Sequence, residues 1–322
     1  MAVSDFREAF IEGNPRLAIR DYGGSGSAVL LVHGIGRTLE DWRLLAPLLR
    51  DEHRVVALDL RLHGHSGEGG WSWDELVVDL ERVCQHLALG RTAIIGQSLG
   101  GILAGVYAAR HSDCPAAINI DGHGWLPPER FPGLPPNLAR EQLAWMKDWM
   151  ARQASALDTP MPEATFRAML DAQKSLAEQL GVPVEVLVAS TWRAAVHDAH
   201  GDYRLRPSGE ALRTIQELTN ETDLFAVYAQ VTTPLLIFQL TAPIAPSAPD
   251  MPPWLHGFLD SFAEGLKREH QALVHHQPNI EVMFLEAPHL ATLSHPAALA
   301  SRILSFLARV APSERLSPPP AG

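Results

Sequence analysis

Short runs of apolar residues, many of them β-branched, recur along this chain and alternate with longer amphipathic stretches. Because these runs are continuous rather than interrupted by polar residues, we expect strands that are buried on both faces of a sheet. They occupy residues 28–33, 54–59, 92–96, 116–121, 234–238 and 280–285. Two of the intervening stretches, residues 73–89 and 99–111, have helical periodicity. The alternation predicts an α/β fold with a doubly wound, mostly parallel sheet.

One long interval departs from this alternation. From residue 124 to residue 228 the pattern is helical, without a convincing strand, and rich in tryptophan and methionine. An all-helical segment between two sheet strands has to lie over one edge of the sheet, so we expect a helical cap. We therefore divide the chain into an α/β core of residues 1–124 and 229–311 and a cap of residues 125–228. The proline-rich residues 242–253 are expected to form a loop, and residues 312–322 a disordered tail.

Composition and charge narrow the class of protein. The chain has 322 residues, of which 46% are hydrophobic and 20% charged, enough for a sizeable buried core. Its net charge of −11 leaves no basic surplus to neutralise phosphates, which argues against nucleic acid and anionic membranes as main partners. The sequence carries no sign of its oligomeric state.

The termini and cysteines bear on the cellular compartment. The N-terminus has no charged leader followed by an apolar run, and no apolar run reaches the roughly 20 residues that span a membrane. We therefore expect a cytoplasmic protein, in which Cys84 and Cys114 are reduced thiols.

The segment Gly96-Gln97-Ser98-Leu99-Gly100 follows a predicted strand and opens a predicted helix. This is the context in which a G-x-S-x-G pattern places a nucleophilic serine on a strained turn, with glycines where side chains would collide with backbone. The helix that begins at Leu99 directs backbone N–H groups and the positive end of its dipole at the reacting centre. We predict that Ser98 is a nucleophile.

Two further segments resemble the α/β-hydrolase superfamily. His33-Gly34-Ile35-Gly36 is similar to the HGxx segment of that family, which implies an oxyanion hole formed by the backbone N–H groups of Ile35, with Gly34, and of Leu99. Residues 59–66 resemble the family's D-x-x-G-x-G-x-S loop but carry Leu62 where glycine is usual. The resemblance covers residues 17–122 and 230–309 and leaves the middle of the chain to a variable cap.

The H-x-H spacing of His63 and His65 could indicate a metal site. No third ligand lies nearby in the sequence, and the resemblance already accounts for His63. We therefore predict neither a metal nor another cofactor.

A serine nucleophile needs a base, and histidine is the side chain whose ordinary pKa suits this task at neutral pH. Of the 15 histidines, His289 follows the last predicted strand and precedes the last helix. The hydrolase family places its base in this loop, usually with glycine where this chain has Pro288, so we predict that His289 is the base. His275 and His276 lie in a predicted helix, so we expect them to face solvent.

The position of the acid departs from the family pattern. The loop after strand 234–238, which usually supplies the acid, reads Gln239-Leu240-Thr241-Ala242-Pro243, and its first carboxylate is Asp250. The alternative is Asp121, at the end of the preceding strand. Haloalkane dehalogenases and zearalenone-type lactonases resemble this chain in carrying their acid there. We favour Asp121. Asp250, another acid or a serine–histidine dyad are the open alternatives, in which Asp121 would only cap its turn.

These residues predict a hydrolase that cleaves an apolar carboxylic ester or lactone through a serine acyl-enzyme. Haloalkane dehalogenases and epoxide hydrolases carry aspartate at the elbow, so Ser98 argues against both reactions. The zearalenone-type lactonases resemble this chain also at Ser294-His295-Pro296. An acyltransferase, thioesterase or cyclase on the same fold, or a non-catalytic small-molecule receptor, is the alternative.

Overall fold

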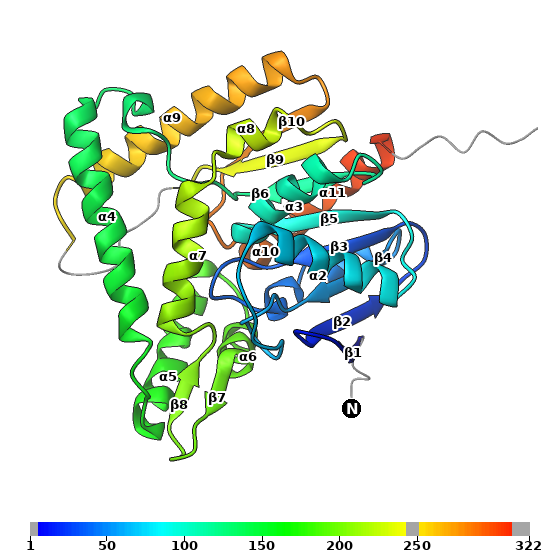
Figure 1. Cartoon of the computed structure of the whole chain (residues 1–322), viewed down its shortest axis with the longest axis vertical. Coiled ribbons are helices and arrows are strands. Elements are labelled where there is room, and N and C mark those ends of the chain that lie inside the picture. The colour runs from blue at the N-terminus through cyan, green and yellow to red at the C-terminus, as the bar shows by residue number, and fades with distance from the viewer. Residues whose placement is uncertain (1–5, 243–250, 311–322) are drawn as a thin grey trace, which may run out of the picture.

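The computed structural model describes residues 6–242 and 251–310, which form a central sheet, helices on both of its faces and a helical projection at one side (Figure 1). The sheet has eight strands in the order β1-β2-β4-β3-β5-β6-β9-β10. Strands β1 and β2 are antiparallel to their neighbours, and the other strands are parallel. The strand bounds are β1 Arg7–Ile11, β2 Leu17–Gly23, β3 Ala28–Val32, β4 Arg54–Leu58, β5 Thr92–Gln97, β6 Ala117–Ile120, β9 Leu235–Leu240 and β10 Ile280–Leu285.

The six strands predicted from apolar runs are all present in this parallel part of the sheet, which confirms the predicted α/β fold class. The prediction missed β1 and β2 at the antiparallel edge. Strand β1 is largely exposed, and β2 carries Arg20, so neither forms a continuous apolar run. Arg20 is nonetheless buried, because its guanidinium pairs with the carboxylates of Glu8 and Glu40.

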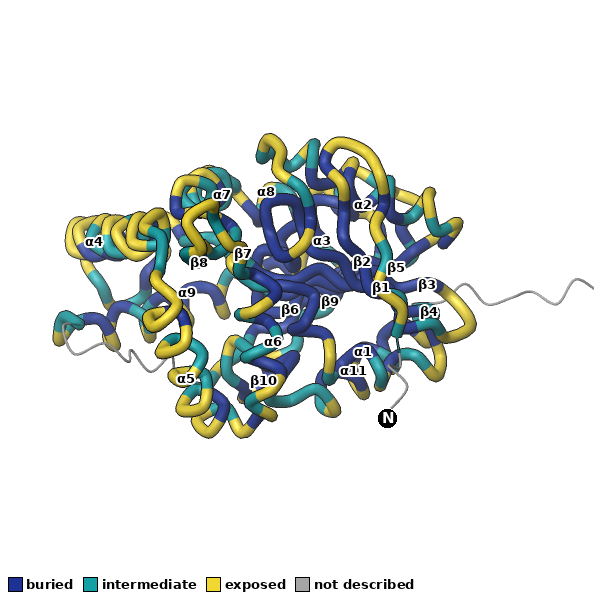
Figure 2. Tube along the Cα trace, turned by 90° about the horizontal axis from the view of Figure 1, so that it is seen from below, coloured by how far each residue is buried: buried dark blue, intermediate teal, exposed yellow. Residues whose placement is uncertain are grey.

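Helices cover both faces of the sheet, and the trace of the sheet is buried between them (Figure 2). Helices α2 (Trp73–His86), α3 (Leu99–Arg110) and α8 (Leu224–Tyr228) lie on one face, while α1 (Ala46–Leu49) and α11 (Pro296–Val310) lie on the other. Strand β3 contributes to both interfaces. Leu30 packs in the cluster with α3, and its neighbour Leu31 packs in the cluster with α11. Burial on both faces is the reason that the strand reads as an unbroken apolar run.

The segment between β6 and β9 forms most of the projection in Figure 1. Its elements are η2 (Pro128–Arg130), α4 (Pro136–Ala156), α5 (Glu163–Leu180), α6 (Val184–Ala194), β7 (Ala195–His197), β8 (Tyr203–Leu205) and α7 (Gly209–Glu221), followed by α8. The expectation of an all-helical segment is corrected by β7 and β8, which pair as a small antiparallel sheet. Strands of three residues are too short to show a period in the sequence.

A helix from outside this segment also joins the projection. Helix α9 (Leu255–His276) follows β9, and its Phe258 and Phe262 pack in one apolar cluster with Leu143 and Met146 of α4. The remaining elements are η1 (Leu39–Trp42) and α10 (Ala291–Ser294).

Several predictions concern residues outside the described ranges. These are the N-terminal residues 1–5, most of the predicted loop at 242–253 including Asp250, and the tail at 312–322. Within the described ranges, no helix combines the length and the apolar character needed to cross a membrane. Cys84 and Cys114 are both free thiols.

Candidate active site

Ser98 lies on the turn between β5 and α3, where the sequence pattern places a nucleophile. Its backbone angles are φ 55° and ψ −121°, a strained conformation for a residue other than glycine. The tight turn explains the flanking glycines. A Cβ on Gly96 would lie 1.9 Å from the carbonyl oxygen of Gly100, and a Cβ on Gly100 would lie 2.1 Å from that of Val32.

The segment after β3 lies directly against Ser98. A Cβ on Gly34 would be 3.0 Å from the Cβ of Ser98, so a larger residue would displace the serine. Ile35 and Leu99 line a cavity together with Ser98, whereas Gly34 is buried and does not line it. In the described part of the chain, the backbone N–H groups of Ile35 and Leu99 have no acceptor. They are therefore available to an oxygen atom bound beside Ser98.

Two buried histidines fix this segment. Leu60 N–H donates to Nε2 of His33 (3.0 Å), and the other ring nitrogen of His33 bonds the carbonyl of Gly34 (2.8 Å). His63 accepts from Gly36 N–H (3.1 Å) and bonds the carbonyl of Arg61 (2.9 Å). Burial lowers the pKa of each histidine to about 3, so both are neutral at pH 7. Both nitrogens of His63 serve this network, which accounts for His63 without a metal.

Asp121 and His289 meet at the carboxyl end of the sheet. Oδ2 of Asp121 lies 2.7 Å from Nδ1 of His289, and Oδ1 accepts the backbone N–H of Leu240 (3.0 Å). This contact is possible because β6 and β9 are adjacent parallel strands, so that Asp121, directly after β6, lies beside the end of β9. In the family pattern the acid follows β9. Here the carboxylate that contacts His289 follows β6, the strand next to β9.

The surroundings of Asp121 keep it ionised. Burial acts to raise the pKa of its carboxyl, but the His289 hydrogen bond, the nearby His123 and His289 rings and the Leu240 N–H outweigh burial. The pKa of Asp121 lies below its ordinary value as a result. An ionised Asp121 accepts a hydrogen bond from the N–H at Nδ1 of His289, so the proton of the neutral ring stays on Nδ1 and Nε2 keeps its lone pair.

The turn that carries Asp121 is itself strained and held by a buried amide. Asp121 has φ 54°, in the left-handed region. The side chain of Asn119 closes the turn, since its Oδ1 accepts Gly122 N–H (2.7 Å) and its Nδ2 donates to the Gly122 carbonyl (2.8 Å). Nδ2 also donates to the hydroxyl of Tyr228, which is fully buried.

The His289 loop is tied to the serine turn through the residue next to Ser98. Nε2 of Gln97 donates to the backbone carbonyl of His289 (2.8 Å), and the Gln97 side chain is buried. In the described ranges, the Ser98 hydroxyl has no hydrogen-bond partner, and it faces the cavity. The structure thus joins Asp121 and His289 directly, and ties the His289 backbone to Gln97, the residue before Ser98.

The Ser98 cavity has a volume of about 160 Å³ and is mostly apolar. Ile35, Leu99 and Ile102 come from the core, while Trp125 and Met150 come from the projection. Helix α7 adds three polar side chains, Gln216, Thr219 and Asn220. The cavity therefore admits a compact apolar group with polar contacts on one wall.

Sequence reasoning missed three residues of this site, Asn119, Gln97 and His123. His123 lies two residues after Asp121 and lines the cavity, so its place after a strand end was an available signal. The roles of Asn119 and Gln97 depend on contacts with distant segments, which no local pattern reveals. Of the other histidines considered, His275 and His276 are exposed at the end of α9.

Comparison with known proteins matches this chain to hydrolases of the same fold. Residues 27–180 match the family model of the alpha/beta hydrolase fold. The chain is 34% identical to a serine hydrolase-like protein of Danio rerio over 134 aligned residues. This alignment covers 40% of each of the two proteins. Over 105 residues it is 34% identical to a fluoroacetate dehalogenase of Burkholderia sp., covering 30% of this chain and 34% of that protein. The chain thus spans less than half the length of these relatives.

The likeness to solved structures extends over almost the whole chain. The crystal structure of E-2-(acetamidomethylene)succinate hydrolase superposes with a TM-score of 0.70, covering 94% of this chain and 99% of that one. At 20% sequence identity, this likeness concerns the fold.

Proposed function

This chain belongs to the α/β-hydrolase superfamily, and on that premise we propose that it is a serine hydrolase acting on carboxylic esters or lactones. Ser98 is the nucleophile, His289 the base and Asp121 the acid. The observation that carries the proposal is the 2.7 Å contact between Asp121 and His289, in a loop that is bonded to the residue next to Ser98.

The reaction follows from the roles of these groups. Ser98 Oγ attacks the carbonyl carbon while its proton passes to Nε2 of His289. The carbonyl oxygen becomes an oxyanion, which accepts hydrogen bonds from the backbone N–H groups of Ile35 and Leu99. Collapse of this intermediate expels the alcohol, which takes the proton from His289, and leaves an acyl group on Ser98. Water, deprotonated by His289, then releases the acid and restores Ser98.

The ionised Asp121 contributes in two ways. It holds the His289 ring in the tautomer whose Nε2 can accept the serine proton, and it stabilises the imidazolium that forms. Its lowered pKa means that it remains charged through the mildly acidic range.

The lining of the Ser98 cavity supports an apolar group next to the scissile carbonyl. Ile35, Ile102, Trp125 and Met150 supply the apolar walls. A lactone can present an apolar group beside its carbonyl as well as an ester can. Opening of its ring leaves the alcohol and the acyl group on one molecule.

The experiment combines a fluorophosphonate probe with p-nitrophenyl esters of several chain lengths. We expect the parent protein to be labelled and to turn over at least one ester, and Ser98→Ala to lose both. Asp121→Asn should lower kcat by about 10⁴-fold, the effect of losing the acid that fixes the histidine tautomer. Asp51→Asn, at an exposed turn, is the matched control and should retain full activity.

Two outcomes would contradict the proposal. A parent protein that is neither labelled nor active would exclude an activated Ser98 and favour a non-catalytic receptor. Full activity in Asp121→Asn, with loss in Asp250→Asn, would move the acid role to the alternative that the sequence left open.

A further inference from the structure

A second cavity adjoins the Ser98 cavity and has no part in the proposed chemistry. Its volume is about 280 Å³, larger than that of the Ser98 cavity. The two cavities share four lining residues, namely His123, Gly124, Trp125 and Asn220. The two cavities therefore meet at these residues, which makes the second cavity a candidate extension of the substrate site at Ser98.

The most buried polar residue that lines this cavity is His270 of α9, which is 2% exposed. Nδ1 of its ring lies 3.0 Å from Oε1 of Gln239. The identity of that oxygen is settled by the other end of the amide, because Nε2 of Gln239 donates to the carbonyl of Ala263 (2.9 Å). Nδ1 of His270 must then carry the proton, which leaves Nε2 as a hydrogen-bond acceptor.

Burial strengthens this assignment, since it lowers the pKa of His270 to about 4 and the ring is neutral at pH 7. In the described ranges, no donor bonds Nε2 of His270. The cavity therefore offers a buried acceptor without a donor.

Two donors line the same cavity. One donor is Lys147 on α4, one of three lysines in the chain. Its ammonium group forms neither an ion pair nor a hydrogen bond with any described residue. The side-chain amide of Asn220, on the wall shared by the two cavities, also has no partner among the described residues.

The formal charges of the lining argue against an anion as the ligand. Lys147 and Arg130 are balanced by Glu221 and Asp223, which line the same cavity. Arg130 is further neutralised by Glu269, at 2.8 Å. The lining thus combines donors and an acceptor without excess charge.

We propose that this second cavity binds a hydroxyl-bearing end of the substrate, while the ester or lactone lies at Ser98. A hydroxyl is the simplest uncharged group that donates one hydrogen bond and accepts others, which suits His270 as acceptor and Lys147 and Asn220 as donors. Leu143 and Leu266 also line this cavity, and they would contact the apolar part of a substrate between its ester and its hydroxyl. The inference rests on the proposed function and specifies its substrate as an apolar, hydroxylated ester or lactone.

The kinetic test uses matched p-nitrophenyl esters. Hexanoate and octanoate esters are compared with the 6-hydroxyhexanoate and 8-hydroxyoctanoate esters, and with esters that end in a carboxylate. We expect kcat/KM for the hydroxylated ester to exceed that of its unsubstituted partner by about three- to tenfold at one chain length or both. A purely apolar cavity would give the opposite order, because it would desolvate the hydroxyl without a partner.

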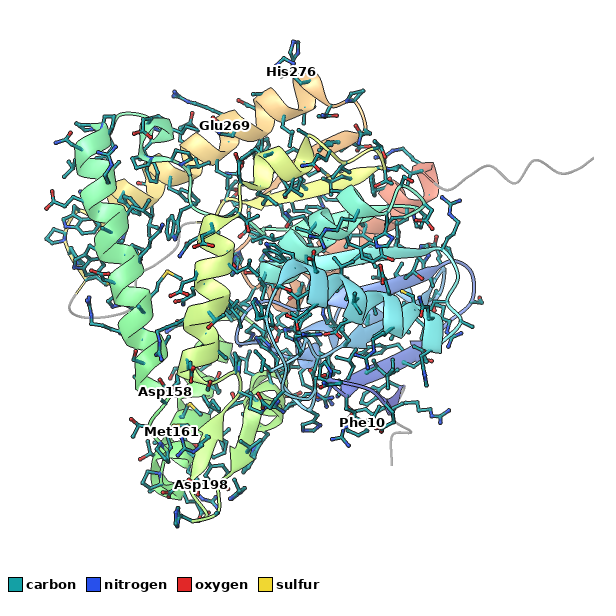
Figure 3. The ribbon with its side chains drawn as sticks, in the orientation of Figure 1. Phe10, Asp158, Met161, Asp198, Glu269 and His276 are labelled. Atoms are coloured by element: carbon teal, nitrogen blue, oxygen red, sulfur yellow. The ribbon has the colours of Figure 1, made fainter. Side chains whose placement is uncertain are left out.

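Substitutions assign that preference to the cavity. His270→Phe and Lys147→Met should each bring the ratio of hydroxylated to unsubstituted kcat/KM to one or below. His276→Phe on the same helix, at the end of α9 far from α4 in Figure 3, and Lys174→Met on α5 are the controls and should keep the parent ratio.

A binding experiment tests the cavity without turnover. In Ser98→Ala with ¹⁵N-labelled histidine, phenol is titrated against fluorobenzene, which has a similar shape but no hydroxyl. We expect phenol, and not fluorobenzene, to shift the Nε2 resonance of His270 in the direction of an accepted hydrogen bond.

The outcomes separate this inference from the proposed function. A preference for the carboxylate esters, or equal kcat/KM for all three sets in an active protein, would overturn the hydroxyl subsite and leave the serine hydrolase intact. If the parent protein neither labels nor turns over, the proposed function fails. The phenol titration then tests by itself whether the second cavity binds a hydroxyl. Equal responses of the His270 resonance to phenol and fluorobenzene would overturn the hydroxyl subsite.

Discussion

Asp121 is the residue at which backbone strain and chemistry coincide. Its positive φ is imposed by the turn between Asn119 and Gly122, and the same turn directs the carboxylate toward His289. A non-glycine residue in this region costs about 1–2 kcal/mol, which surrounding contacts must offset. The buried Asn119 amide supplies those contacts on both sides of Gly122.

Asn119→Ala should therefore impair catalysis through Asp121. We expect kcat to fall by about 10- to 100-fold, with a much smaller change in KM, because Asn119 does not line the Ser98 cavity. Steady-state kinetics of the ester that the parent prefers, with Asn137→Ala on the exposed surface of α4 as control, would measure this effect. An unchanged kcat in a folded Asn119→Ala protein would show that the turn holds Asp121 without the amide.

Leu62, like Asp121, is a residue other than glycine that has a positive φ. The family pattern has glycine at this position, and the structure gives Leu62 a φ of 66°. Glycine is favoured there because this left-handed conformation is costly for other residues. Leu62 therefore holds a backbone conformation that is more costly for leucine than it would be for glycine.

At the scale of elements, α6 helps to fix the projection to the core. Arg193 near its end is buried and contacts two core carboxylates, Asp59 (2.8 Å) and Glu8 (3.0 Å). One turn earlier, the hydroxyl of Ser190 lies 3.0 Å from that of Thr38. These contacts join α6 to the loop after β4, to β1 and to the start of η1.

Arg193→Met should destabilise the protein, because it leaves the fully buried Asp59 without its cation. Removing one partner of a buried pair typically costs about 3–5 kcal/mol, and the partial exposure of Glu8 favours the lower end, about 3 kcal/mol. Chemical denaturation measures the change. Arg167→Met, which breaks an exposed pair with Glu163 on α5, should leave the free energy of unfolding nearly unchanged, because solvent screens such a pair. Equal effects of the two substitutions would contradict an anchoring role for α6.

At the scale of the whole molecule, the buried neutral histidines predict how stability depends on pH. His33 and His63 have folded-state pKa values of about 3, against about 6.5 in an unfolded chain. Between these values the unfolded chain binds more protons than the folded one, so the free energy of unfolding falls as the pH is lowered.

The size of the effect can be tested by denaturation at several pH values. From pH 7 to pH 5, each of these histidines should remove about 2 kcal/mol of stability. His63→Gln should make the pH dependence shallower, whereas His276→Gln, at an exposed position, should leave it unchanged. A stability that is constant from pH 7 to pH 5 would contradict neutral burial of these rings.

The sequence by itself determined the parts of this protein that depend on local pattern. Continuous apolar runs located the six parallel strands, because a strand buried on both faces has no polar positions to alternate. The glycines around Ser98 located the serine turn, because a Cβ added to Gly96 or Gly100 would lie about 2 Å from a backbone oxygen. The exposed strand β1 and the short strands β7 and β8 lack such a signal.

The tertiary structure decided what depends on contacts between distant segments. The sequence left Asp121 and Asp250 both open as the acid, and only the adjacency of β6 and β9 puts the Asp121 carboxylate against His289. The second cavity likewise joins His270 of α9 to Lys147 of α4, more than a hundred residues apart. The order of strands and the packing of helices set these distances, and spacing along the chain does not encode them.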